Sequence, residues 1–448
     1  MNLDTFIATN RFGLGPDGTE PQRIGNDPRG WLLAQLQKPY MPVEIASHGG
    51  PGSAGLKLYI EEIVGKKAKK NNPETMPQEK KGKEIRSLYL RQIGERFIAQ
   101  QKSSQPLFER LVMFWSNHFT VSIQKPVVTP LACQFEAEAI RPHVIGRFVD
   151  MLKAVERHPA MLIYLDNVRS QGPNSPFGRR QSKGLNENLA REILELHTLG
   201  VGGGYTQEDV IALAKIITGW SIDRGEGGAA GGFLFRANVH EPGPKTLLGK
   251  KYQDAGEREG LAALEDIARH PSTARHIATK LARHFIADEP PASAVDRLAQ
   301  SFSASDGDLL AVYRTLVSMP ECWTNPLAKF KTPYEYVLSA ARLLGLKPQA
   351  ERVTIALESV NFRVFSAPSP AGYADIASAW VSPDAIKKRI DWAKTVSVLV
   401  PPRIVPLDLA AQSFGPVMRE ETRFAISGAA SGADGIALLL SSPEFQRR

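Results

Sequence analysis

GLNENLAREILELHTLGVGGGYTQEDVIALAKIITGW, residues 184–220, is the stretch that most directly predicts the fold. Its first half places apolar residues at the spacing of one helix face. On a wheel of about 100° per residue they fall within about 80° of one another, and they are Leu185, Leu189, Ile193 and Leu196. We therefore predict an amphipathic helix whose apolar stripe is buried.

The second half of this stretch predicts a tight turn and a second helix. Gly200 and the glycines at 202–204 free the backbone for a turn. Thr206 and Asp209 have the S/T-x-x-D/E spacing of a capping box at a helix start. A glycine-rich turn at a helix start can hold an anion, but this one lacks the Gly-Lys-Ser/Thr of a P-loop and the G-x-G-x-x-G spacing of a dinucleotide site. A connection between two helices is the favoured interpretation.

Helical spacing continues through the rest of the chain, while alternating strand patterns are scarce. Phe108, Leu111, Val112 and Trp115 show it clearly. With 448 residues, of which 42% are hydrophobic, the chain can bury a large core. We predict a mainly α fold, a large multi-helix single body over residues 1–448, because no change in composition marks a linker.

Two segments are expected to leave this helical body. Residues 65–83 are rich in Lys, Asn, Pro and Gln and poor in apolar residues, which predicts a mobile, solvated, lysine-rich loop. Residues 225–249 are rich in glycine and contain Phe233 and Phe235, which alternate with other residues. This pattern predicts a glycine-rich excursion with a short β-hairpin.

The net charge of +8 is unevenly distributed. From Lys57 to Lys83 there are eight lysines and four glutamates, a surplus of four, so half of the net charge lies in this segment. This distribution argues against nucleic-acid binding as the function, since that function requires basic residues clustered on one folded face.

The sequence also bears on the compartment. Two cysteines, Cys133 and Cys322, are too few for a disulfide framework. The start of the chain has no basic region followed by about 7–15 apolar residues, and no run approaches the about 18 apolar residues of a membrane span. We expect a cytoplasmic protein without a membrane span, with export alongside a partner left open.

Polar side chains share a face of the helix predicted over 184–199. Glu192 falls at the edge of the apolar stripe, with Asn188 and Glu195 beside it. A buried carboxylate must be paired, protonated or metal-bound. One interpretation is an ion-pair network, with Arg191 bound to Glu187 or Glu195 and Glu192 bound to an arginine of another helix. The other is a catalytic or metal-ligating carboxylate pair.

Two histidines are further candidates. His118, in FWSNHFTV, is surrounded by aromatic and amide groups, which is typical of a packed, hydrogen-bonded histidine. His240, in NVHEPGPKTLLG, lies beside Glu241 and near Lys245 on a predicted loop, where functional residues are common. No G-x-S-x-G, H-E-x-x-H, C-x-x-C or EF-hand motif occurs.

These residues make up the predicted site. The catalytic candidates are Glu192, Glu195 and His240. The substrate-binding candidates are Asn188, Arg191, His118 and Tyr205. The cofactor is left open, with a divalent metal as one candidate.

Several motifs together resemble a known bacterial family, the proteins with domain of unknown function 1800. They run almost from end to end: NRFGLGP (10–16), FWSNHFTV (114–121), FEAEAIRPHVIGRF (135–148), HPAMLIYLDN (158–167), the stretch from 184 to 210, TGW (218–220), NVHEPGPKTLLG and LLLSSPEFQRR (438–448). The family pattern around His240 resembles His-Asp-x-Gly-x-Lys, and Glu241 replaces the aspartate here. The resemblance implies one continuous fold and no particular reaction. It also suggests a sulfatase-like exported protein as a partner.

The leading functional hypothesis is a helical hydrolase or lyase that acts on an envelope or extracellular polymer, or on a small-molecule substrate. In it, Glu192 is the acid/base or metal-bound carboxylate, and His240 is a proton donor or ligand. The alternative is a non-catalytic partner or assembly factor for the sulfatase-like protein, with the lysines of residues 66–83 as an electrostatic contact.

Overall fold

The computed structural model describes residues 1–50, 53–61, 78–181, 184–223 and 231–448. The fold is mainly α, as predicted, and the strands of the described residues form two small two-stranded sheets. None of the helices in these ranges is long and apolar enough to cross a membrane.

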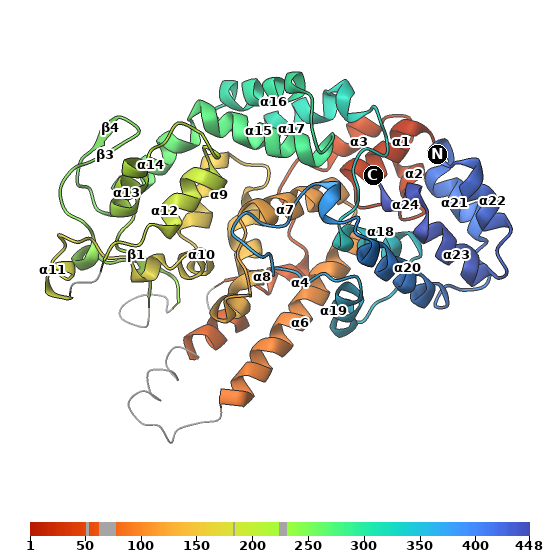
Figure 1. The fold of residues 1–448 in the computed structure, drawn as a ribbon, viewed down its shortest axis with the longest axis horizontal. Coiled ribbons are helices and arrows are strands. Elements are labelled where there is room, and N and C mark those ends of the chain that lie inside the picture. The colour runs from red at the N-terminus through yellow and green to blue at the C-terminus, as the bar shows by residue number, and fades with distance from the viewer. Residues whose placement is uncertain (51–52, 62–77, 182–183, 224–230) are drawn as a thin grey trace.

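The helices of the first half of the chain are α1 Leu3–Ile7, α2 Glu20–Ile24, α3 Pro28–Ala34, α4 Val43–Ala46, α6 Gln78–Lys102, α7 Pro106–His118, α8 Ala132–Phe135, α9 Phe148–Glu156, α10 Pro159–Tyr164, α11 Gly178–Gln181, α12 Asn188–Glu192 and α13 Gln207–Ile216. In this half, α1 to α3 lie toward one end of the molecule, α6 to α8 lie at the centre, and α9 to α13 lie toward the other end (Figure 1). Helix α7 lies at the centre, and nearly all of its side chains are buried.

The second half of the chain runs along one edge of the molecule to its opposite end (Figure 1). Its helices are α14 Glu257–Ala268, α15 Pro271–Phe285, α16 Ala292–Ala304, α17 Leu309–Ser318, α18 Pro333–Leu343, α19 Ala350–Ser359, α20 Pro383–Ser397, α21 Pro406–Phe414, α22 Glu420–Ser427, α23 Gly432–Ser441 and α24 Pro443–Gln446. Helices α15 to α17 form one edge, and α20 to α24 return beside the N-terminal helices (Figure 1). One cluster of buried apolar residues extends from Phe6 to Phe445.

The helix predicted over 184–199 differs from the prediction in its second part. It begins at Asn188 and changes after Glu192 into a π-helical turn, Ile193–His197 (η6). The wider turn rotates the later residues, so Leu194 is fully buried while Leu196 is only half-buried. The capping box of Thr206 and Asp209 at the start of α13 is confirmed.

The described strands form short antiparallel hairpins in and around the segment 225–249. Strand β2 (Phe233–Phe235) pairs antiparallel with β1 (Trp220–Ile222), which comes from outside the predicted segment. Strand β3 (Lys245–Leu247) pairs with β4 (Lys250–Tyr252). The predicted short β-hairpin is therefore confirmed, but the strands extend past its predicted bounds, because β1 lies before residue 225 and β4 lies after residue 249. Residues 224–230 lie outside the described residues.

The predicted lysine-rich loop is only partly described. Residues 65–77 lie outside the described residues, and α6 begins at Gln78. The last part of the segment predicted as a loop, 78–83, is therefore helical.

Buried ion pairs join the central helices. The carboxylate of Glu109 accepts two hydrogen bonds from Arg141, at 2.8 and 2.7 Å. Arg141 also pairs with Glu136, which accepts from Arg96 as well. All four side chains are almost fully buried. Breaking such a pair leaves an uncompensated buried charge, so this network ties α6 and α7 to the segment 136–141.

Candidate functional site

A cavity of about 310 Å³ lies between helices α7, α15 and α18 and the segment 362–376. This volume is at the small end of the range of ligand pockets, so it suits one small molecule or one unit of a polymer. Its walls carry apolar and aromatic side chains together with convergent polar groups. Ala371, Ala374 and Ile376 line its rim and are exposed, so the cavity lies next to the surface.

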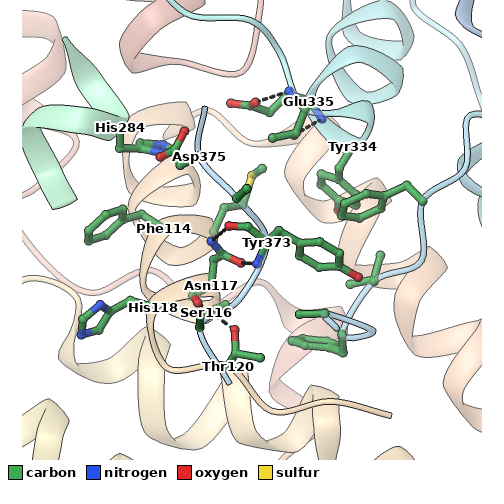
Figure 2. Close-up of a pocket in the computed structure, with 18 of the residues that line it drawn as sticks. Phe114, Ser116, Asn117, His118, Thr120, His284, Tyr334, Glu335, Tyr373 and Asp375 are labelled. Carbon is green, nitrogen blue, oxygen red and sulfur yellow. Dashed lines mark hydrogen bonds and ion pairs between the residues drawn. The ribbon is translucent and has the colours of Figure 1, made fainter. Parts of the chain in front are cut away.

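The motif FWSNHFTV at the end of α7 supplies one wall (Figure 2). The side chain of Asn117 donates to the carbonyl oxygen of Tyr373 at 2.9 Å and accepts from the Tyr373 N–H at 2.7 Å. Gly372 has a φ of +82°, and a Cβ there would lie 2.4 Å from the carbonyl oxygen of Asn117. The motif thus holds the segment 362–376 against α7 through an amide pair that requires glycine beside it.

A histidine–aspartate pair faces the cavity. The Nδ1–H of His284, on α15, donates to Oδ2 of Asp375 at 2.6 Å. Asp375 is also held by Lys329, whose Nζ lies 3.2 Å from Oδ1. Despite its burial, the pKa of Asp375 lies far below the ordinary value, because His284 and Lys329 stabilise the charged form.

The orientation of this pair leaves the other nitrogen of His284 free. Its Nε2 is buried and has no hydrogen-bond partner among the described residues. Burial lowers the pKa of His284 below the ordinary value, with Asp375 opposing the shift. The imidazole is therefore neutral at pH 7 and carries a lone pair on Nε2, which is the state required of a general base.

Lys280 brings an amine to the same cavity, one helical turn before His284 on α15. It is half-buried, and no carboxylate of the described residues forms an ion pair with it. Burial lowers its pKa from 10.5 to about 8, while Asp375 opposes the shift. At pH 7 it remains a cation, so together with Arg283, which also lines the cavity, it favours an anionic ligand.

His118, a predicted substrate-binding residue, lines the cavity but is tied to the backbone. Its Nε2–H donates to the carbonyl oxygen of His197 at 3.1 Å. His276 does the same to the carbonyl oxygen of Leu196 at 2.9 Å. These two bonds satisfy carbonyls at the end of the π-helical turn. Nδ1 of His118 has no partner among the described residues, and burial holds the pKa of His118 well below its ordinary value.

The structure brings together most of the residues predicted on α12 and η6. The hydroxyl of Tyr205 donates to Oε2 of Glu195 at 3.3 Å. Glu192 is half-buried, and its pKa is raised, first by burial, with Glu195 adding to the shift and His197 opposing it. No arginine of the described residues forms an ion pair with Glu192, so the arginine partner expected from another helix is not found among them.

The remaining predicted residues of this helix lie nearer the surface. Arg191 pairs with Glu187 at 3.1 Å, which is one of the two partners expected, and also donates to Gln207. Asn188 is exposed, at the start of α12. Neither residue lines the cavity.

His240 lies elsewhere, beside the second hairpin. It is buried and belongs to a group with Lys245, Asp254 and Glu259. Among the described residues no hydrogen bond or ion pair joins His240 to Glu192 or His118. The predicted site therefore divides into separate places: the cavity beside His118, the carboxylates on α12 and η6, and the group around His240.

Several cavity residues were not predicted from the sequence, namely Lys280, Arg283, His284, Tyr373 and Asp375. A signal for three of them is present in ARHIATKLARHF (274–285), where His276, Lys280, Arg283 and His284 recur at intervals of three and four. Cationic and titratable groups on one face of an otherwise apolar helix indicate a candidate site just as the carboxylates of α12 do. No comparable pattern surrounds Asp375, which lies in an irregular segment.

Comparison with known proteins agrees with the motif pattern. The profile of the family described as "Protein of unknown function (DUF1800)" matches residues 7–447, nearly the whole chain. No curated protein and no solved structure matches the chain. Three of the motifs that carried the resemblance lie in the wall of the cavity, in the buried ion pairs and in the π-helical turn, namely 114–121, 135–148 and 184–210. The chain belongs to the DUF1800 family.

Proposed function

We propose that the protein is a lyase or hydrolase acting on an acidic unit of an envelope or extracellular polymer in the central cavity. The observation that supports this most is the placement of Lys280 and His284 on one face of α15. Residues four apart on a helix are neighbours, about 5–6 Å between Cβ atoms. A cation that holds a carboxylate thus lies one turn from a neutral base.

Elimination fits this pair of groups best. Lys280 would bind the carboxylate of the substrate, which makes the neighbouring C–H more acidic. Nε2 of His284 would remove that proton, a C=C bond would form, and the C–O bond at the β-carbon would break. The leaving oxygen would take the proton from the imidazolium, so the two products together have the atoms of the substrate. Asp375 would stabilise the imidazolium.

The hydroxyl of Ser116 and the carboxylate of Glu335 are already bound by other side chains, which favours elimination over attack by either of them as a nucleophile. Oγ of Ser116 donates to Glu136 at 2.9 Å. The carboxylate of Glu335 is held by Arg110 and Arg448. Hydrolysis would require a water molecule activated by His284 in place of C–H abstraction, and it remains the alternative reaction of the same base.

The test uses acidic polysaccharides such as polygalacturonate, alginate and hyaluronan with the full-length protein. Elimination produces an unsaturated sugar that absorbs in the ultraviolet, whereas hydrolysis produces a reducing end without that absorbance. Replacing His284 with Gln should lower the rate by about 10²–10⁴-fold. His276→Gln is the matched control, because His276 lies on the same helix and Gln can still donate to Leu196. Equal rates for the wild type and His284→Gln would refute the assignment.

A second candidate function is that of a partner or assembly factor for a sulfatase-like exported protein. Large apolar side chains are exposed around the C-terminal helices, with Val398, Leu399 and Phe424 between 69% and 80% exposed. Exposed apolar residues of this kind are common at protein interfaces. Copurification of a sulfatase-like protein with the wild type and its loss from a Val398→Ser, Phe424→Ser variant would favour this function. No copurification with the wild type would argue against it.

A further inference from the structure

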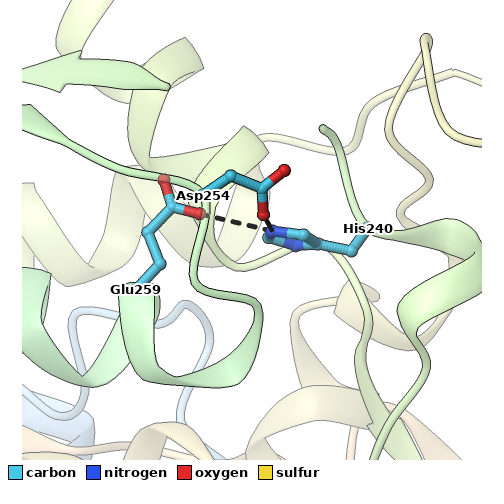
Figure 3. A group of neighbouring side chains, drawn as sticks. All are labelled: His240, Asp254 and Glu259. Carbon is cyan, nitrogen blue, oxygen red and sulfur yellow. Dashed lines mark ion pairs between the residues drawn. The ribbon is translucent and has the colours of Figure 1, made fainter. Parts of the chain in front are cut away.

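Three oxygen- and nitrogen-bearing side chains converge beside the second hairpin, away from the cavity (Figure 3). They are His240, Asp254 and Glu259, from the loop after β2, the loop after β4 and the first turn of α14. Nε2 of His240 lies 3.2 Å from Oε2 of Glu259 and 3.8 Å from Oδ1 of Asp254. One ligand atom from each residue lies within 4.8 Å of the others.

Backbone groups orient two of these side chains. The Nδ1–H of His240 donates to the carbonyl oxygen of Thr218 at 2.8 Å, so in the neutral ring Nε2 carries the lone pair that faces the carboxylates. Oδ2 of Asp254 accepts the N–H of Gly243 at 2.9 Å, which turns Oδ1 toward His240. Hydrogen bonds of this kind, made by the atoms that do not face the metal, are typical of metal ligands.

The burial of Glu259 is a second, independent indication that a further group binds at this place. Its side chain is fully buried, and Oε1 has no hydrogen-bond partner among the described residues. A buried carboxylate oxygen without a partner costs free energy unless a further group binds it. Asp254, by contrast, is 43% exposed, so the group opens to solvent on that side and a water molecule can reach it.

We propose that His240, Asp254 and Glu259 form a binding site for a divalent transition-metal ion such as Zn²⁺, with one coordination position open to water. Around a tetrahedral zinc with bonds of about 2.0–2.1 Å, ligand atoms are about 3.3 Å apart, close to the 3.2 and 3.8 Å observed. One histidine and two carboxylates with an open position are a ligand set that zinc accepts. This proposal is independent of the function proposed for the cavity.

Lys245 is the resident cation of this group and would compete with the metal. Its Nζ lies 2.9 Å from Oε2 of Glu259 and 3.4 Å from Nε2 of His240, and it also donates to the carbonyl oxygen of Glu241 at 2.6 Å. Metal binding must release the bond to Glu259, while the bond to Glu241 can remain. Removing the ammonium group should therefore strengthen metal binding.

The test measures zinc binding by the full-length protein after treatment with a chelator. Zinc is titrated in competition with a fluorescent chelator, and the retained metal is counted by mass spectrometry after gel filtration. We expect one zinc per chain, at least about tenfold weaker binding by Asp254→Asn, and tighter binding by Lys245→Met. Glu265→Gln is the matched control, because Glu265 lies on the same helix as Glu259 and its side chain is 44% exposed.

These measurements distinguish a specific zinc site from nonspecific zinc binding. No retained zinc in the wild type, or equal affinity of the wild type and Asp254→Asn, would overturn the proposal, as would weaker binding by Lys245→Met. Circular dichroism shows whether each variant is folded. A further measurement, the visible spectrum of the wild type with Co²⁺, requires no variant. We expect the bands of four- or five-coordinate cobalt with nitrogen and oxygen ligands. The spectrum of hydrated cobalt alone would refute the site.

Discussion

Raising the pH should release an acidic ligand from the central cavity, because the protonated amine of Lys280 is expected to hold it. Burial lowers the pKa of Lys280 to about 8, with Asp375 opposing and Arg283 adding to the shift. Binding is therefore complete below that pKa and is lost above it. With a pKa of about 8, the protonated fraction falls from about 0.9 at about pH 7 to about 0.09 at about pH 9, a tenfold loss of affinity. A lysine of ordinary pKa would stay charged over this range.

Other cavity groups should not titrate in this window. Burial lowers the pKa of both His118 and His284, so both stay neutral. The carboxylate of Asp375 stays ionised, since its pKa is far below the ordinary value. Tyr334 stays protonated, because burial raises its pKa to about 12.

The assay is isothermal titration calorimetry with D-glucuronate at the two pH values, with glucose as the neutral control ligand. The Lys280→Arg variant should bind D-glucuronate with the same affinity at both pH values, because a guanidinium stays protonated. The Lys280→Met variant should bind D-glucuronate about tenfold or more weakly at the lower pH, because it lacks one charge-assisted hydrogen bond. Equal affinity of the wild type at both pH values, or the same loss in Lys280→Arg, would refute the reasoning.

Three further predictions concern other parts of the molecule. Gly372→Ala should cost about 1–3 kcal/mol and weaken glucuronate binding, because the new Cβ meets the carbonyl of Asn117; wild-type melting and affinity would contradict it. Glu109→Gln should lower the urea midpoint by the equivalent of about 3 kcal/mol or more, since Arg141 keeps a buried charge; an unchanged midpoint would show that the pair is not needed. Glu192 has a raised pKa, so its contribution to stability is present at acidic pH and is lost as the pH rises through that pKa. Glu192→Gln should therefore melt at or above the wild type at pH 7 and lose activity if Glu192 is catalytic, whereas unfolding would favour a structural role.

The local features of this chain could be predicted from its sequence. The spacing of apolar residues predicts the mainly α class, because the side chains that form one helix face are only three or four residues apart. The capping box of Thr206 and Asp209 and the pairing of Arg191 with Glu187 follow from the same short range. The family also follows from the sequence, since its motifs extend along the chain.

Contacts between segments far apart in the sequence decided where the helix departs from regular α geometry and which site residues come together. The helical wheel misplaced Leu196 because η6 is a π-helical turn, whose carbonyls are bound by His118 and His276, 79 and 80 residues away. The orientation of His284 depends on its hydrogen bond to Asp375, 91 residues further on, and nothing in the sequence around that aspartate marks it. The sequence by itself determined the mainly α class and offered candidate site residues such as His118, Glu192 and His240. Only the tertiary structure decided which of those residues meet, because burial and pairing at a site depend on neighbours that local spacing does not contain.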